Sequence, residues 1–317
     1  MKEKRIKTPS TEQQNKKKIG PKTIISYSLI GLVIVSLGVT TGVFLKRELS
    51  QAEIDYSGFD PENYRMDSKA LLDEYNKNPN KQFTAAELIN IGLEKYRQCE
   101  NCYSIGIGTA STIVSQTIRN AQIKVGDHYF EESISYSSMV AVANRVNQVG
   151  INNDIELNKG KATGTEAVKY QDSIKEYKAD EYKKAWGKTL DEMFIYIISN
   201  QTVLEEGTKI EKYDDYIKVT ANLDTNISTY FYKLQMREIS NLDKLPTFDQ
   251  LSQTYIFTKD MTLKYCSVDE KYKASMTGVT ASIHNTIDYY YHANEVREIP
   301  NNEQLIDYSI EGENHYE

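Results

Sequence analysis

Two cysteines separated by two residues are the strongest local sign of chemistry in this sequence. Cys99 and Cys102 enclose the dipeptide Glu-Asn, and the third cysteine, Cys266, lies far along the chain. Such a pair can form a tight disulfide in an oxidising compartment, or act as a redox pair when the first thiol lies at a helix N-terminus. Here the pair follows a predicted helix, whose dipole disfavours a thiolate. We therefore expect a structural disulfide, with free or otherwise paired thiols and a thiol–disulfide enzyme as alternatives.

Three other side chains have the spacing of metal ligands. His284, Asp288 and His292 recur every fourth residue, which on a helix would place them on one face. The tyrosines at 289–291 and the β-branched residues nearby favour a strand instead, in which four residues span about 13 Å. That distance is too long to chelate one ion, and two neighbouring cysteines are too few for a zinc site. We expect no metal and no other cofactor.

A pair of glycines resembles part of a phosphate-binding loop. Gly106 and Gly108 lie in the segment GIGTAS, but the third glycine is missing, and β-branched residues follow where a helix should begin. A strand that tolerates two glycines explains the segment better. Neither a Gly-x-Ser-x-Gly elbow nor a Gly-x-x-x-x-Gly-Lys-Ser/Thr loop occurs. The sequence predicts no catalytic residue, and we expect that the protein is not an enzyme.

A membrane-spanning helix is predicted near the start of the chain. Residues 23–45 (Thr23 to Leu45) carry no charge, and Lys22 and Lys46 flank them. At about 1.5 Å per residue this run reaches roughly 34 Å, enough to cross a hydrocarbon core of about 30 Å. A cleaved signal peptide is the alternative, because residues 50–52 resemble a cleavage site. Its apolar region would be only about 7–15 residues long, which favours the uncleaved anchor.

The distribution of charge predicts the orientation of that span. Residues 1–22 hold eight Lys or Arg and two Glu, a net charge of +6, so the total of −7 leaves −13 for the remainder. Basic flanks stay on the cytoplasmic side. We expect a single-pass protein of the cell membrane with a basic cytoplasmic head (1–22) and an extracellular C-terminal domain. Nucleic acid is not an expected partner of this acidic domain, because phosphate binding requires concentrated Lys and Arg.

The rest of the chain divides into three parts. Residues 46–82 are polar and rich in turn residues, which predicts a stalk, and residues 293–317 form an acidic tail that we expect to be mobile. Between them, residues 83–292 are long enough to form one domain with a sizeable core. Its first helix has clear start signals, since Thr84 and Glu87 can form a capping box between Phe83 and Leu88.

The predicted domain is α+β. β-branched and aromatic stretches predict five consecutive antiparallel strands at 104–113, 114–125, 128–136, 139–149 and 154–161, and a sixth at 168–177. Helices are predicted at 180–186 and at 189–199, where Thr189 and Glu192 can form a second capping box, and another follows a strand at 216–223. The last strands are predicted at 251–258, 262–268, 270–277 and 279–292. About ten antiparallel strands are expected in all.

The last predicted strand has two different faces. Alternation places its apolar residues on one face and His284, Thr286, Asp288 and His292 on the other. The apolar face should line a core or a cavity, and it holds Val279, Ala281, Ile283, Ile287, Tyr289 and Tyr291. If a ligand binds there, we expect Ile283, Ile287, Tyr289 and Tyr291 to contact it.

This order of elements resembles the lipoprotein-carrier (LolA-like) half-barrels of bacterial cell envelopes. The resemblance covers roughly residues 84–291 and includes the segment 245–272, which looks like a late hairpin of such sheets. It implies a strongly curved antiparallel sheet covered by helices, with a hydrophobic, lipid-like ligand between them and no catalysis. A purely structural or docking module that contacts another surface protein is the alternative, since inward side chains look alike in a cavity and in a filled core.

Overall fold

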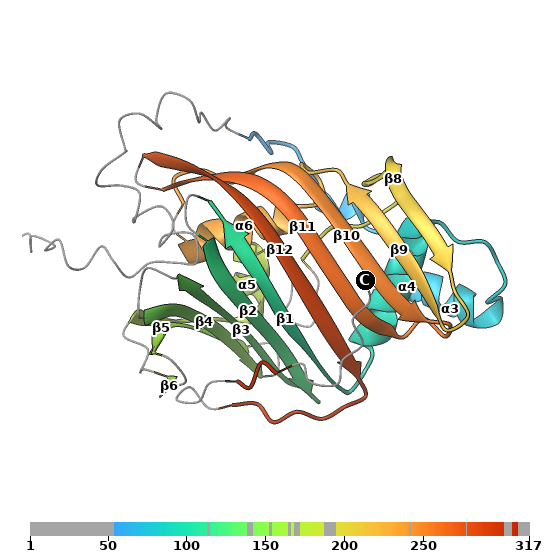
Figure 1. The fold of residues 1–317 in the computed structure, drawn as a ribbon, viewed down its shortest axis with the longest axis horizontal. Coiled ribbons are helices and arrows are strands. Elements are labelled where there is room, and N and C mark those ends of the chain that lie inside the picture. Colours follow the sequence, from blue (N-terminus) through green and yellow to red (C-terminus); the bar gives the residue numbers. More distant parts are fainter. Residues whose placement is uncertain are drawn as a thin grey trace, which may run out of the picture.

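One large antiparallel sheet dominates the computed structural model (Figure 1). Its twelve strands follow the order β6-β5-β4-β3-β2-β1-β12-β11-β10-β9-β8, with β7 paired to β5, and the sheet is curved and not closed. The α+β class is confirmed, whereas the number of strands differs from the expected ten. The structure describes residues 54–112, 115–137, 142–151, 154–163, 166–167, 172–186, 195–240, 242–276, 278–300 and 306–309.

The first half of the sheet is a meander, as predicted. Its first five strands form four antiparallel pairs, each between strands that follow one another in the sequence. Gly126 has φ of +59°, a conformation that suits glycine, in the short turn after the second strand. The strands are β1 (Asn101–Ser111), β2 (Ser115–Val125), β3 (His128–Ser137), β4 (Val142–Ile151), β5 (Asp154–Thr163), the short β6 (Glu166–Ala167) and β7 (Asp172–Tyr177).

The second half contains longer strands and joins the first half through β12, which pairs with both β1 and β11. Its strands are β8 (Val203–Lys212), β9 (Tyr216–Leu223), β10 (Thr247–Thr258), β11 (Leu263–Met276) and β12 (Val279–Ala293). The strands predicted at 262–268 and 270–277 are one strand. Asp269 does not break it, because its side chain bonds to the ring of His284 on the neighbouring strand. The strongly charged β8 was not predicted.

The main helices lie on one face of the sheet, which we call the inner face (Figure 1). They are α3 (Ser68–Lys77), α4 (Ala85–Arg97), α5 (Ala179–Trp186) and α6 (Tyr230–Ser240), and a 3-10 turn, η2 (Pro61–Tyr64), precedes them. The predicted capping box is confirmed: the amide of Glu87 donates to Thr84 Oγ1, and the amide of Thr84 donates to Glu87 Oε2. Buried residues of α4 pack on β9, β10 and β11.

The helix predicted at 189–199 is wrong for its last residues. Residues 195–199 are irregular, because the hydroxyl of Thr202 takes the place of helical hydrogen bonds. It accepts from the amide of Ser199 at 2.8 Å and donates to the carbonyl of Ile197 at 3.0 Å. Thr189 and Glu192, the second predicted capping box, lie outside the described residues.

The described part of the predicted stalk packs against the domain. Leu72 of α3 is buried in the core next to α4. The amine of Lys233 on α6 is fully buried and donates to the hydroxyl of Tyr56 at 2.9 Å. Burial lowers the pKa of Lys233 to about 8. Residues 54–82 are thus part of the folded domain, because their apolar and aromatic side chains find partners on α4 and α6.

Part of the predicted acidic tail is also ordered. Ile306 and Tyr308 are buried against β1, β2 and β3 on the outer face of the sheet. The hydroxyl of Tyr308 donates to the buried carboxylate of Glu132 at 2.8 Å, and Arg119 lies over the ring of Tyr308. Apolar side chains between the acidic residues of the tail explain this docking.

The predicted membrane span, residues 23–45, lies outside the described residues, as does the basic head. Within the part that the structure describes, no helix is both long enough and apolar enough to cross a membrane.

Candidate functional site

The four predicted ligand-contacting residues point toward the helices. Ile283, Ile287 and Tyr291 are buried and Tyr289 is partly buried; Ile283 and Ile287 alternate with more exposed neighbours, whereas Tyr290 is buried on the other face. The ring of Tyr291 packs edge-on against Tyr96 of α4 at 5.1 Å between centroids. Ile283 and Ile287 instead belong to a second apolar cluster, together with Met236 of α6. The structure therefore divides the four residues between two clusters, and Tyr289 contacts both.

A buried carboxylate lies on the same inner face. Glu270 of β11 is fully buried and lies opposite Asn285 of β12. Its Oε1 accepts from Asn285 Nδ2 at 2.8 Å and from the hydroxyl of Tyr232 at 3.1 Å. Its Oε2 accepts from the hydroxyl of Tyr196 at 3.1 Å. We call these four residues the Glu270 site. It connects α6 and the irregular segment 195–199 to the centre of the sheet.

The electrostatics of this site follow from its burial. Burial raises the pKa of Glu270 to about 7, although its three hydrogen-bond donors act in the opposite direction. Burial and the nearby carboxylate raise the pKa of Tyr196 and of Tyr232 well above the usual value. Both phenols therefore stay protonated and act as donors. Glu270, by contrast, changes its charge near neutral pH.

The surroundings of the Glu270 site are aromatic and apolar. The ring of Tyr232 contacts the rings of Tyr196 at 5.5 Å and Phe248 at 5.7 Å, and Phe248 stacks on Tyr272 at 4.9 Å. Inside this enclosure Asn285 Oδ1 is buried and has no hydrogen-bond partner among the described residues. A buried acceptor without a donor costs free energy, so it marks a point where a donor from outside the chain would be favourable.

A second polar chain begins at Tyr289 and crosses the sheet. Asn120 Nδ2 of β2 donates to the Tyr289 hydroxyl at 2.9 Å, and the hydroxyl of Ser133 on β3 donates to Asn120 Oδ1 at 2.6 Å. The ring of Tyr289 lies over Gly106, where a Cβ would be 2.6 Å from the ring. The Gly106–Gly108 segment is a strand, as predicted. Gly106 leaves the room that the tyrosine ring needs.

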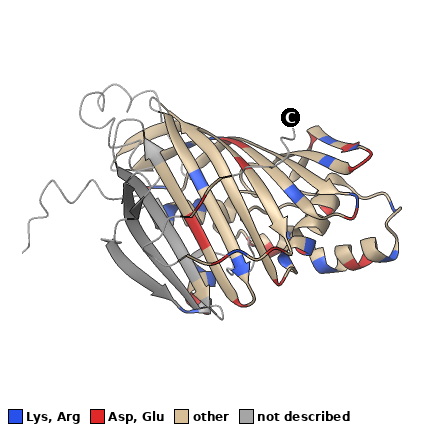
Figure 2. Cartoon of the chain, turned by 60° about the horizontal axis from the view of Figure 1, so that its bottom comes forward, with Lys and Arg blue, Asp and Glu red and all other residues tan. Residues whose placement is uncertain are grey.

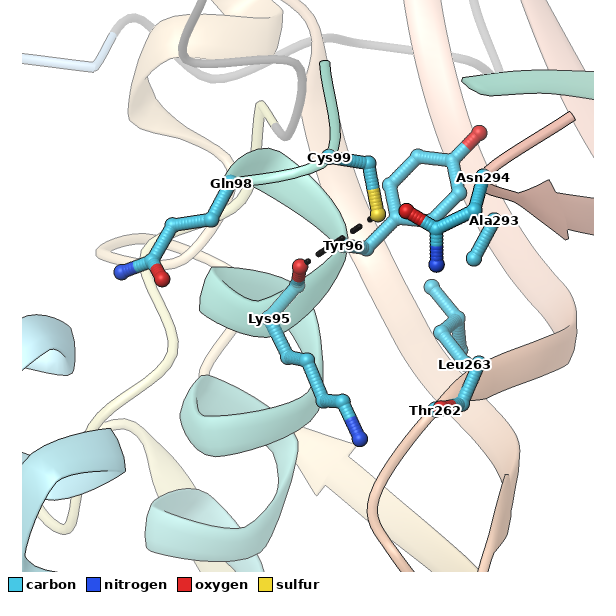
Figure 3. A pocket seen from close by; sticks show the side chains of 8 residues that line it. All are labelled: Lys95, Tyr96, Gln98, Cys99, Thr262, Leu263, Ala293 and Asn294. Carbon is cyan, nitrogen blue, oxygen red and sulfur yellow. Dashed lines mark hydrogen bonds between the residues drawn. The ribbon is translucent and has the colours of Figure 1, made fainter. Parts of the chain in front are cut away.

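The two close cysteines lie at the junction of α4 and β1. Both are buried and free in the structure, and so is Cys266. Cys99 Sγ donates to the carbonyl oxygen of Lys95 at 3.6 Å, and burial raises the pKa of Cys102 to about 11. A half-open pocket of about 190 Å³ reaches Cys99 (Figure 3). Because a nucleophilic thiol must ionise readily, the raised pKa of Cys102 disfavours this thiol as a nucleophile.

The three residues considered as metal ligands all have other partners. His284 bonds to Asp269 at 2.8 Å, Asp288 accepts from the Tyr265 hydroxyl at 2.6 Å, and the ring of His292 stacks on Tyr103 at 4.1 Å. All three lie on the strand β12, as the tyrosine run predicts. Among the described residues no cluster of three His, Cys, Asp or Glu side chains is suited to hold a metal ion.

The Glu270 site was not predicted from the sequence. One signal was present: Glu270 occupies an inward position between Val268 and Tyr272 in the strand alternation, where an acidic residue is unusual. Asn285 likewise lies between Ile283 and Ile287 on the apolar face. Tyr196 and Tyr232 come from distant segments, and nothing in their local sequence indicates that they meet a carboxylate.

In comparisons with known proteins, no protein-family model and no curated protein matches the chain.

Proposed function

We propose that this protein is a single-pass, non-enzymatic binding protein of the cell envelope, with a cytoplasmic N-terminus. Its extracellular domain holds an apolar, lipid-like ligand between α6 and the inner face of the sheet. One observation carries the proposal: the unpartnered acceptor Asn285 Oδ1, next to the buried carboxylate of Glu270, inside an aromatic and aliphatic enclosure. A binding site that combines apolar walls with few convergent polar groups is the usual form of a small-molecule site.

The site has an apolar surface and a polar surface, and each is expected to contact a different part of the ligand. Its apolar portion packs on Ile283, Ile287 and Met236, and its polar end carries a hydrogen-bond donor for Asn285 and Glu270. The side chain of Tyr232 bridges α6 and the sheet at this point, so entry requires α6 to shift. The resemblance to LolA-like half-barrels implies a ligand in the same place, between sheet and helices. The phenols of Tyr196 and Tyr232 stay protonated. The polar groups of the site therefore hold and orient a ligand through hydrogen bonds.

Ligand uptake tests this proposal. The full chain is purified in amphipol, and a lipid extract of the purified protein is searched for co-purifying lipids by mass spectrometry. The same protein is then titrated with a fluorescent long-chain alcohol. We expect saturable uptake that Asn285→Leu weakens about tenfold, the size expected for one lost buried hydrogen bond. Gln253→Leu is the matched control, because Gln253 is another buried inner-face amide with an unpartnered atom and is bonded to Tyr255 instead. Absence of both co-purifying lipid and probe uptake would refute the ligand.

A docking module without a ligand is the second candidate, and the α4 side of the inner face favours it. There the helix packs so closely that a Cβ at Gly92 would lie 2.2 Å from the ring of Phe257. If this filled packing extends to α6, the chain takes up no probe, and Asn285→Leu only lowers the free energy of unfolding, because the buried Glu270 loses the hydrogen bond from Asn285. Measurement of uptake and stability on the same variant separates the two candidates.

A further inference from the structure

The outer edge of β8 is a free sheet edge with an unusual surface. β8 ends the strand order and pairs only with β9 among the described strands (Figure 1). Leu204, Ile210 and Tyr213, which are 45%, 39% and 44% exposed, are three of the four large exposed hydrophobic residues in the described part of the chain. All three lie on β8 or directly after it. An exposed edge with apolar side chains is a template for pairing with another strand.

The register with β9 identifies the backbone groups at this edge. The amide of Tyr213 donates to the carbonyl of Tyr216 at 2.9 Å, which closes the hairpin. Hydrogen-bonded and non-bonded pairs alternate in an antiparallel ladder. Lys209 and Glu211 therefore direct their backbone groups toward β9, whereas Ile210 and Lys212 direct theirs away from the sheet.

The side chains select one way to pair this edge with a second copy of itself. Two antiparallel copies can bond their outward groups with the two-fold axis at Ile210, at Glu211 or at Lys212. The last two registers place Glu211 opposite Glu211, or Lys212 opposite Lys212. Of these three registers, only the axis at Ile210 places no like charges opposite each other within residues 208–212: it places Ile210 opposite Ile210, Thr208 opposite Lys212, and Lys209 opposite Glu211 twice. Opposite charges across strands stabilise a pair, and like charges destabilise it.

We propose that β8 is a homodimerisation edge, through which two copies of this chain join their sheets antiparallel about a two-fold axis at Ile210. Such an interface is isologous, as in most two-fold dimers. β8, at the upper right of Figure 2, carries both basic and acidic residues, so each copy supplies both halves of the charge pairs. The second copy also covers the exposed side chain of Ile210.

Disulfide trapping tests the register. In a hydrogen-bonded antiparallel pair the Cα atoms lie about 5.5 Å apart, within the range that a disulfide spans. We expect the full chain in detergent with Ile210→Cys to form a cross-linked dimer on mild oxidation. Leu204→Cys is the matched control: it is equally exposed, but its two copies would lie roughly 40 Å apart at about 3.4 Å per residue. Equal cross-linking of the two variants, or none of either, would overturn the proposal.

A charge exchange tests the same interface without oxidation. Lys209→Glu and Glu211→Lys each place like charges opposite each other in the dimer, and both positions are exposed. We expect each single variant to weaken dimerisation at least tenfold in analytical ultracentrifugation, and the double variant to restore it to within about threefold. Edge lysines also protect free edges against pairing. If the parent chain stays monomeric, or if the double variant does not regain dimerisation, the proposal is overturned and the lysines of β8 protect a free edge instead.

Discussion

Gly92 of α4 lies directly against the ring of Phe257 on β10, in a space that admits no side chain. A Cβ at position 92 would be 2.2 Å from Cε1 and 2.5 Å from Cδ1 of that ring. Phe257 is fully buried and stacks in parallel on Tyr255 at 5.8 Å. The ring has little room to move away, so glycine at 92 is what allows α4 to pack closely on the sheet.

Gly92→Ala therefore gives the first prediction, because it should change the free energy of unfolding in the direction opposite to that expected in an isolated helix. In an isolated helix this change stabilises by up to about 1 kcal/mol. Here overpacking should dominate, with a net loss of about 1–3 kcal/mol in the free energy of unfolding, measured by urea denaturation. Adding Phe257→Leu should recover part of that loss, because it removes the ring that clashes. A stabilised Gly92→Ala variant would show that the contact is not tight.

Tyr308→Phe tests whether the C-terminal segment is fastened to the sheet. The hydroxyl of Tyr308 donates to Glu132, a fully buried carboxylate of β3. Loss of a donor to a buried carboxyl group should lower the free energy of unfolding by about 1–3 kcal/mol and speed amide exchange in β3. Tyr213→Phe is the matched control, since its hydroxyl bonds to the exposed Glu211. We expect that variant to keep the stability of the parent, and equal effects would contradict the docking.

Local sequence signals predicted the regular parts of the fold. The capping pair Thr84 and Glu87 marks a helix start through contacts only three residues apart, and both hydrogen bonds are present. Strand alternation likewise identified the five-strand meander and the buried face of β12. In each case the residues that determine the structure lie close together in the sequence.

Where distant residues determine the structure, local sequence patterns do not predict it. β8 has few β-branched residues, and its strand conformation depends on pairing with β9 and on a bulge near Gly207, whose φ is +77°. The Glu270 site brings together four residues from four segments, and Tyr196 belongs to a segment that was predicted as helix. No periodicity can indicate such a meeting, because each side chain alone is compatible with an ordinary surface or core position.

The cysteines provide a third prediction. The structure contains three free, buried thiols, so alkylation of the unfolded, non-reduced protein should add three labels by mass spectrometry. In the folded protein, Cys102 should react slowly with maleimide at pH 7, because burial raises its pKa to about 11. A single label, located on Cys266 by peptide mapping, would establish the disulfide between Cys99 and Cys102. Rapid reaction of both in the folded state, with insulin-reductase activity that Cys102→Ser abolishes, would support the redox enzyme.

Glu270 makes the stability of the domain depend on pH. Its pKa is about 7 in the folded protein and near 4.5 in the unfolded chain, so the folded state binds the proton more tightly between these values. Stability must therefore fall as the pH rises from about 4.5 to about 7, and it should change no further through this group above pH 7. The difference is on the order of 3 kcal/mol, because one pKa unit corresponds to about 1.4 kcal/mol.

The last prediction follows from that sign: Glu270→Gln should remove most of the loss of stability between pH 5 and pH 7.5. Urea denaturation of the parent and the variant at both pH values measures it, and only the difference between their slopes counts, since other groups titrate in both proteins. Glu94→Gln is the matched control, because Glu94 is a buried carboxylate that is paired with Arg97 at 2.8 Å and lies outside the Glu270 site. That variant should keep the slope of the parent. If Glu270→Gln also keeps it, Glu270 is already ionised at pH 5 in the folded protein, and the hydrogen bonds from Asn285, Tyr196 and Tyr232 outweigh its burial.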